Sequence, residues 1–143
     1  MVQILSGIQS SVAALDAERT RLDVISENIA NAHTTRGPDG KPYQRQVVVF
    51  ETALRNALGG GDNQSQTPTL QVARIDKDPR PSELVYEPGH PDAGPDGMVA
   101  MPNVNMNEEM ADMITASRAF EANLEVVKNA RAMAVQTLSI GKH

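Results

Sequence analysis

Apolar residues near the N-terminus recur at steps of three and four positions, so that they share one side of a helix. Ser11 and Glu18 interrupt this series, and charged residues such as Asp16 and Asp23 lie on the opposite side. The pattern predicts an amphipathic helix with coiled-coil character over about residues 3 to 32. Its apolar stripe comprises Ile4, Ile8, Leu15, Leu22, Ile25 and Ile29.

The C-terminal part of the chain repeats this design. Asn105 and Glu108 stand three positions apart, as in a capping box with Asn in place of Ser or Thr, and Gly141 is placed to end the helix. The pattern predicts a helix over residues 105 to 140, roughly 50 Å long at the standard rise per residue. Its apolar stripe comprises Met106, Met110, Met113, Phe120, Leu124, Val127, Ala134 and Leu138.

The middle of the chain has a different character, because all nine prolines lie between Pro38 and Pro102. Proline interrupts helices, so this part is not expected to continue either terminal helix. Alternating apolar residues predict one strand over about residues 43 to 50 and a second around residues 70 to 75. The stretch SELVYEPG, residues 82 to 89, predicts a third strand.

Two further segments of the middle lack a strand pattern. Residues 57 to 69 are rich in glycine and polar residues, which predicts a flexible loop. Residues 87 to 103 contain several X-Pro pairs, each of which disfavours helix in the preceding residue. We therefore expect a rigid extended connection over residues 87 to 103.

These elements predict a mainly α fold with three segments. Residues 1–35 supply the N-terminal helix and residues 103–143 the C-terminal helix of a helical core domain, packed as a coiled-coil-like pair. Residues 36–102 form a small β-rich or irregular middle segment, a β-hairpin with extended chain.

The hydrophobic core is expected to be thin, because the chain has two Phe, two Tyr and no Trp. Aromatic side chains dominate burial in most cores and interfaces, so the isolated chain is expected to be only marginally stable. Two helices of this length need more apolar partners than the middle segment can supply. We therefore expect helix packing between different chains rather than a self-sufficient bundle.

Charge and composition exclude several classes of protein. The net charge of −5 argues against a nucleic-acid-binding protein, which normally presents a basic face. No run of about 18 apolar residues occurs, so direct membrane insertion is not expected. The first twenty residues do not resemble a cleaved signal peptide. The absence of cysteine excludes disulfides, thiolate chemistry and cysteine-based zinc sites.

Candidate chemistry is sparse. None of the three histidines has another His or Cys at ligand spacing, so we expect no transition-metal site. His90, Asp92 and Asp96 gather on a Gly/Pro framework, but they lack the alternating ligands and closing Glu of an EF-hand. No nucleophile elbow or phosphate-binding glycine motif occurs. The sequence therefore predicts no catalytic site and no cofactor.

Two stretches resemble a known family. Residues 22–51 contain the run NIANA at Asn28–Ala32, and residues 85–141 contain the run MPNVN at Met101–Asn105, followed by a long helix start, EEMADMITASRAFEAN. Both resemble the bacterial flagellar rod and hook axial proteins. Within these they are similar to the family of flagellar basal-body rod protein C, a proximal-rod subunit.

This resemblance implies a structural role without enzymatic activity. Members of the family form the drive shaft that transmits torque to the hook, with their terminal helices in the inner wall of a helical tube and the middle segment outside it. The implied partners are copies of the chain itself, other proximal and distal rod proteins, the rotor ring base or rod adaptor, and the flagellar type III export apparatus. The implied location is the periplasmic rod, reached without a cleaved signal peptide.

The resemblance and the two apolar stripes together indicate an assembly interface. Members of the family commonly have Asn where this chain has His33, so a helix-exit role is favoured over a catalytic role for that residue. Asn28 and Asn31 are expected to contact adjacent subunits. The expected interface comprises Ile8, Leu15, Leu22, Ile25, Asn28, Ile29, Asn31, Asn103, Asn105, Met106, Met110, Met113, Phe120, Leu124, Val127 and Leu138.

Two other function classes remain open from the residues alone. One is a cytoplasmic coiled-coil adaptor or export chaperone, which would use the same apolar stripes. The other is a periplasmic hydrolase that opens the cell wall for the rod. Such an enzyme would need a carboxylate pair, for which Asp92 and Asp96 are the candidates.

Overall fold

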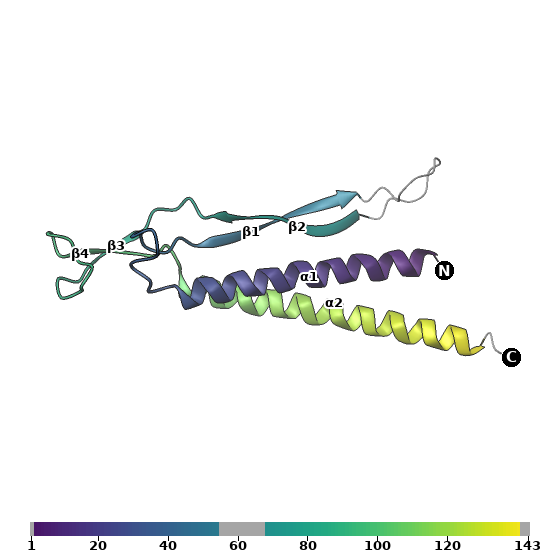
Figure 1. The fold of residues 1–143 in the computed structure, drawn as a ribbon. Coiled ribbons are helices and arrows are strands. Elements are labelled where there is room, and N and C mark those ends of the chain that lie inside the picture. The colour runs from purple at the N-terminus through teal and green to yellow at the C-terminus, as the bar shows by residue number, and fades with distance from the viewer. Residues whose placement is uncertain (1, 55–67, 141–143) are drawn as a thin grey trace.

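The computed structural model describes residues 2–54 and 68–140. Figure 1 shows two long helices lying side by side, a β-hairpin running along one of them, and a second small hairpin at the end of the molecule away from both termini. The prediction of a mainly α chain with a small β-rich middle is confirmed. In chain order the elements are α1 (Val2–Ala30), β1 (Gln46–Leu54), β2 (Pro68–Lys77), β3 (Glu83–Tyr86), β4 (Met98–Met101) and α2 (Met106–Ile140).

Small residues occupy several of the buried positions of the helix pair. Ala17 on α1 is 2% exposed, while Ala116 and Ala130 on α2 are fully or almost fully buried. A small side chain at the contact lets two helix backbones approach closely, and larger side chains then fill the flanks. Most of the predicted stripe residues accordingly lie half-buried beside this alanine seam.

The inward face of α1 differs from the predicted stripe because α1 has two partners. It contacts α2 on one side and the β1–β2 hairpin on another. Val24 and Ile25 are therefore both buried, although only Ile25 belongs to the predicted stripe. Among the described helices and strands, α2 packs against α1 alone, and its predicted residues Met110 and Leu138 are 51% and 70% exposed.

The start of α2 follows the predicted cap. The side-chain oxygen of Asn105 accepts hydrogen bonds from the backbone N–H groups of Asn107 at 3.0 Å and Glu108 at 3.4 Å. This satisfies two of the donors that a helix start leaves unpaired. The carboxylate of Glu108 instead accepts from Arg80 at 3.5 Å.

The β1–β2 hairpin confirms the first two predicted strands. The strands pair antiparallel, and the register shifts between Val49 and Phe50, where a β-bulge interrupts the ladder. The predicted flexible loop over residues 57 to 69 lies outside the described residues, except that Pro68 and Thr69 belong to β2. The first strand begins at Gln46 rather than near residue 43, because the Tyr43 and Arg45 side chains hydrogen-bond to Asn28 of α1 and Glu109 of α2.

The third predicted strand is confirmed as β3, but the rigid extended connection after it is wrong. Residues 98–101 form β4, which pairs antiparallel with β3. Between them the chain makes three consecutive turns, closed by the backbone bonds His90 N–H to Glu87 O, Ala93 N–H to His90 O and Gly97 N–H to Gly94 O. Each turn has a proline at its second position, where the fixed φ of proline is favourable. An X-Pro pair therefore excludes helix here without requiring extended chain.

Candidate assembly interface

A cluster of polar side chains lies where the end of α1, the start of β1, the end of β2 and the start of α2 meet. We call this cluster the polar junction. It joins elements that are far apart in the sequence, so it fixes how the two helices and the β1–β2 hairpin are placed relative to one another. Its central residues are Asn28, Arg45, Asp78, Asn103 and Glu109.

Asn28 is the most fully bonded residue of the polar junction. Its side chain is 1% exposed. The amide nitrogen donates to the carbonyl of Gln46 at 2.9 Å and to Glu109 Oε2 at 3.1 Å. The amide oxygen accepts from the Gln46 N–H at 2.9 Å and from the Tyr43 hydroxyl at 2.9 Å. All of the hydrogen-bonding capacity of a carboxamide is thus used inside the subunit.

Glu109 and Arg45 form the ionic centre of the polar junction. The Glu109 carboxylate is fully buried, and Arg45 Nε donates to its Oε1 at 2.6 Å. Burial alone would lower the pKa of Arg45, but its hydrogen bond to Glu109 and the charge of that carboxylate act in the opposite direction, and the net pKa is raised. Arg45 therefore stays charged, as a buried carboxylate requires of its partner.

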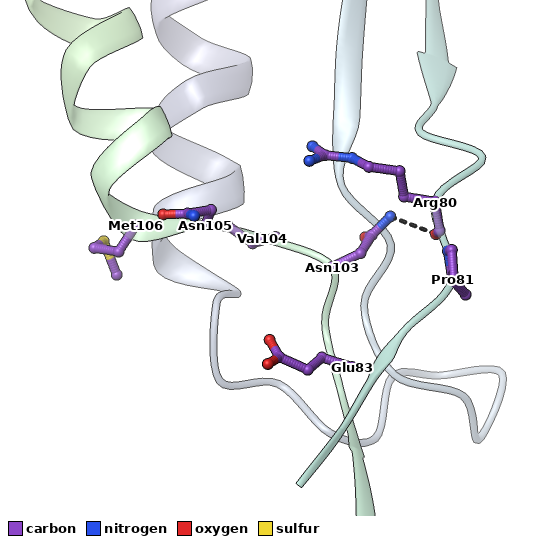
Figure 2. A pocket seen from close by; sticks show the side chains of 7 residues that line it. All are labelled: Arg80, Pro81, Glu83, Asn103, Val104, Asn105 and Met106. Atoms are coloured by element: carbon purple, nitrogen blue, oxygen red, sulfur yellow. Dashed lines mark hydrogen bonds between the residues drawn. The ribbon is translucent and has the colours of Figure 1, made fainter.

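Asn103 connects the polar junction to the segment that precedes α2. Its side-chain oxygen accepts from the Arg45 N–H at 2.8 Å. Its nitrogen donates to the Arg80 carbonyl at 2.8 Å, the bond drawn as a dashed line in Figure 2. A groove of about 420 Å³ lies beside it. The groove is lined by Arg80, Pro81, Glu83, Asn103, Val104, Asn105 and Met106.

Asp78 links β2 to both arginines of the region. Its Oδ2 accepts from Arg80 Nε at 3.0 Å and from Arg45 Nη1 at 3.3 Å, and its Oδ1 accepts from the Arg80 N–H at 2.9 Å. The hydrogen bond from the Arg80 side chain is the largest of the contributions that lower the pKa of Asp78, to about 2 from 3.8.

This lowered pKa predicts an acid-dependent loss of stability. The stabilising contribution of ionised Asp78 is complete above about pH 5, where the unfolded chain is ionised as well, and is lost progressively as the pH falls through about 2. After allowance for solvent screening of the exposed Arg80 side chain, we expect this contribution to be about 1–2 kcal/mol. Urea unfolding at several pH values between 2 and 5 measures it. The Asp78→Asn variant should show a shallower pH dependence, and an unchanged slope would contradict the assignment.

Asn28 belongs to the interface expected from the sequence, but the sequence does not connect it with Tyr43, Arg45, Asp78 or Glu109. One signal was available. Glu109 precedes Ala116 by seven residues and Ala130 by twenty-one, so it continues the buried seam of α2 by whole heptads. A charged residue in that position needs a buried partner, which the sequence does not identify.

The remaining predicted interface residues differ in how exposed they are. Ile25 is buried against its own chain, and Met110 and Leu138 are highly exposed. Asn105 is exposed at the start of α2, and Asn31 donates to the Glu27 carbonyl at 2.9 Å. Those left half-buried are Ile8, Leu15, Leu22, Ile29, Asn103, Met106, Met113, Phe120, Leu124 and Val127. Contacts with other subunits stay a prediction for all of them.

The described residues offer little to support the chemical alternatives. No group of three His, Asp or Glu side chains among residues 2–54 and 68–140 could hold a metal ion. Asp92 accepts from the Thr35 hydroxyl at 2.8 Å and pairs with Arg36 at 3.3 Å, which gives it a structural role in holding the turns to the end of α1. Within the same residues, no helix is long and apolar enough to cross a membrane.

Comparison with known proteins identifies the family through both helices. The family model "Flagella basal body rod protein" matches residues 8–38, and the model "Flagellar basal body rod FlgEFG protein C-terminal" matches residues 96–140. The first match contains Asn28, and the second contains Asn103 and Glu109, so the two matches meet at the polar junction.

Individual relatives match almost the whole chain. The flagellar basal-body rod protein FlgC of Borreliella burgdorferi is 42% identical over 96% of this chain and 97% of its own length. FlgC of Yersinia enterocolitica is 40% identical over 91% of this chain and 92% of its own, and FlgC of Bacillus subtilis is 35% identical over 92% and 94%. At this identity and coverage, the chain belongs to the family of the flagellar basal-body rod protein FlgC.

Proposed function

We propose that this chain is a structural subunit of the flagellar basal-body rod, which assembles with copies of itself and with other rod components. The observation that carries the proposal is the 42% identity to a FlgC rod protein over nearly the full length of both chains. The fold suits this role, because long helices joined to a hairpin by buried polar contacts make a stiff unit.

The place of the subunit in the rod and its further partners are inferred from the same family. We place the subunit in the proximal rod, where it transmits torque toward the hook and has no enzymatic activity. Its further partners are distal rod proteins, the rod adaptor at the rotor ring base and the flagellar type III export apparatus. Nothing favours the cytoplasmic adaptor or the hydrolase over this role.

The outer side of α2 is the best candidate for contacts between subunits. It carries large apolar side chains that α1 leaves uncovered, with exposed fractions between 51% and 70%. Burial of such side chains is the main driving force for helix association, and we expect coiled-coil-like packing against helices of neighbouring subunits. The exposed residues are Met110, Ile114, Val126, Met133, Val135 and Leu138.

Asn28 has an indirect role in assembly under this proposal. Because its carboxamide is saturated inside the subunit, we propose that it supports assembly by fixing the start of α2 against α1 and β1. Asn31 and the half-buried stripe residues remain candidates for direct contacts with neighbours.

A matched pair of substitutions tests the proposed surface. Ile114 on α2 is 55% exposed and Ile75 on β2 is 45% exposed, so Asp at either position should change the free energy of unfolding by only about 0.5 kcal/mol. In cells that lack the native gene, Ile114→Asp should abolish swimming and remove the chain from isolated basal bodies, because a charge is placed in the helix interface. Ile75→Asp should support both.

Two results would count against the proposal in different ways. If neither variant impairs swimming, the outer side of α2 is not an assembly surface. If the native chain itself is absent from purified basal bodies, the rod function is wrong.

A further inference from the structure

Two of the large apolar side chains that α1 leaves uncovered on α2 are methionines. Met110 is 51% exposed and Met133 is 56% exposed. Among the described helices and strands α2 packs against α1 alone, and it lies at the outer edge of the molecule (Figure 1). A reagent in solution therefore reaches Met110 and Met133 more readily than the half-buried methionines of the described residues, which are Met98, Met101, Met106 and Met113.

Each exposed methionine shares a side of α2 with an exposed β-branched residue. Met110 and Ile114 are four positions apart, and Val126 and Met133 are seven apart, so the members of each pair lie one above the other on the helix. Ile114 and Val126 are 55% and 52% exposed. All four belong to the surface proposed above for contacts between subunits. Each pair thus combines one sulfur atom with one side chain of carbon and hydrogen only.

The thioether sulfur is the group of each pair that a peroxide oxidises. The sulfur attacks one oxygen of hydrogen peroxide, so that an S–O bond forms and the O–O bond breaks. The sulfur is oxidised by two electrons to a sulfoxide, while the other oxygen is reduced and leaves as water with both protons. The aliphatic side chains of Ile114 and Val126 do not react. The chain has no cysteine that would consume the oxidant first.

Oxidation at these two positions changes the surface more than the fold. Both side chains are more than half exposed, so a polar group on either removes little burial within the chain. In a contact between subunits the sulfoxide oxygen would be buried, which costs free energy unless a donor meets it. Resting on the rod function proposed above, we propose that Met110 and Met133 form a redox-sensitive modification site, at which peroxide converts the free subunit into a form that does not assemble.

The rate of oxidation at each methionine tests the first step. After timed exposure of the purified chain to hydrogen peroxide, peptide mass spectrometry should show Met110 and Met133 oxidised several-fold faster than Met106 and Met113. Far-UV circular dichroism should not change. In intact basal bodies the same two residues should react several-fold more slowly than in the free chain, because neighbouring subunits cover them. Equal rates in either comparison would overturn the proposal.

Substitutions at the two sulfur positions test the effect on assembly. Met110→Gln/Met133→Gln imitates the oxidised state, since Gln is polar, unbranched and close to Met in length. Met110→Leu/Met133→Leu is the matched control, because it keeps an apolar surface that peroxide does not oxidise. In cells that lack the native gene, the Gln variant should fall about tenfold in isolated basal bodies, and the Leu variant should stay near the native level.

A competition between two chains in one cell tests oxidation itself. Cells that carry both the native chain and Met110→Leu/Met133→Leu form new basal bodies during a sub-lethal pulse of hydrogen peroxide. The ratio of the Leu variant to the native chain in these basal bodies should rise several-fold over the ratio without peroxide. Damage to other components cancels, because both chains experience it. An unchanged ratio would contradict the proposed site.

These measurements separate the modification site from the rod function. If the native chain is present in basal bodies and the Gln variant reaches the same amount, the redox-sensitive site is wrong while the rod function stands. If the native chain is missing from basal bodies that are otherwise complete, the rod function fails and the proposed site fails with it.

Discussion

Replacement of Arg45 by Met is expected to destabilise the subunit by about 3–5 kcal/mol, because it leaves a buried carboxylate without its partner. Glu109 is fully buried and accepts its 2.6 Å hydrogen bond from Arg45 Nε. Methionine keeps much of the side-chain length but supplies no charge and no donor. Urea unfolding followed by far-UV circular dichroism measures the loss, and unfolding of the variant even without urea would agree with it.

The control for this prediction is an arginine of the same chain in an exposed ion pair. Arg74 pairs with Asp76 at 2.7 Å, but the two side chains are 66% and 45% exposed. Arg74→Met should therefore leave the urea midpoint of unfolding almost unchanged, because an exposed ion pair contributes little to stability. The double variant Arg45→Met/Glu109→Leu should recover part of the loss, since no unpaired charge remains. A cost for Arg45→Met as small as that for Arg74→Met would show that the polar junction does not hold the fold together.

Replacement of Asn28 by Asp is expected to have the second largest effect, a loss of about 3 kcal/mol at neutral pH. The change is nearly isosteric, so packing is preserved. The amide nitrogen, which donates at 2.9 Å to the Gln46 carbonyl and at 3.1 Å to Glu109, becomes an oxygen that faces two acceptors. One of these acceptors is itself negatively charged.

The pH dependence distinguishes this effect from general damage. Repulsion raises the pKa of the introduced carboxyl group above its unfolded value, so the variant should regain stability as the pH falls from 7 toward 5. Asn31→Asp is the matched control, because Asn31 is partly exposed, donates to the Glu27 carbonyl in the last turn of α1 and accepts from the Thr34 hydroxyl at 3.1 Å. It should cost about 1 kcal/mol or less. A loss for Asn28→Asp that does not diminish at pH 5 would contradict the proposed repulsion.

The elements that could be predicted from the sequence are those whose signal is local. The two helices were predicted to within about two residues, since helical periodicity and the Asn105 cap depend only on neighbours a few residues apart. The strands were predicted from alternation in the same way, except β4. Its four residues follow three turns, each with a proline at its second position. An X-Pro pair considered alone predicts extended chain as readily as a turn, so the strand after these turns was missed.

The candidate site was less predictable, because its contacts span long separations. Arg45 and Glu109 are 64 residues apart, and Asn28 and Glu109 are 81 apart. An amphipathic stripe shows that a helix has a buried side, but not which neighbours bury it. Asn28 was therefore expected to contact an adjacent subunit, whereas the fold surrounds it with Tyr43, Gln46 and Glu109 of its own chain.

By itself the sequence determined the terminal helices, most strands and, through its NIANA and MPNVN runs, the family. Local periodicity and turn chemistry are sufficient for the first two, and resemblance for the third. Only the tertiary structure decided that Arg45 neutralises the buried Glu109. It also decided which apolar residues of α2 stay exposed. The physical reason is that α1 packs against both α2 and a hairpin, while α1 is the one described helix or strand that α2 packs against.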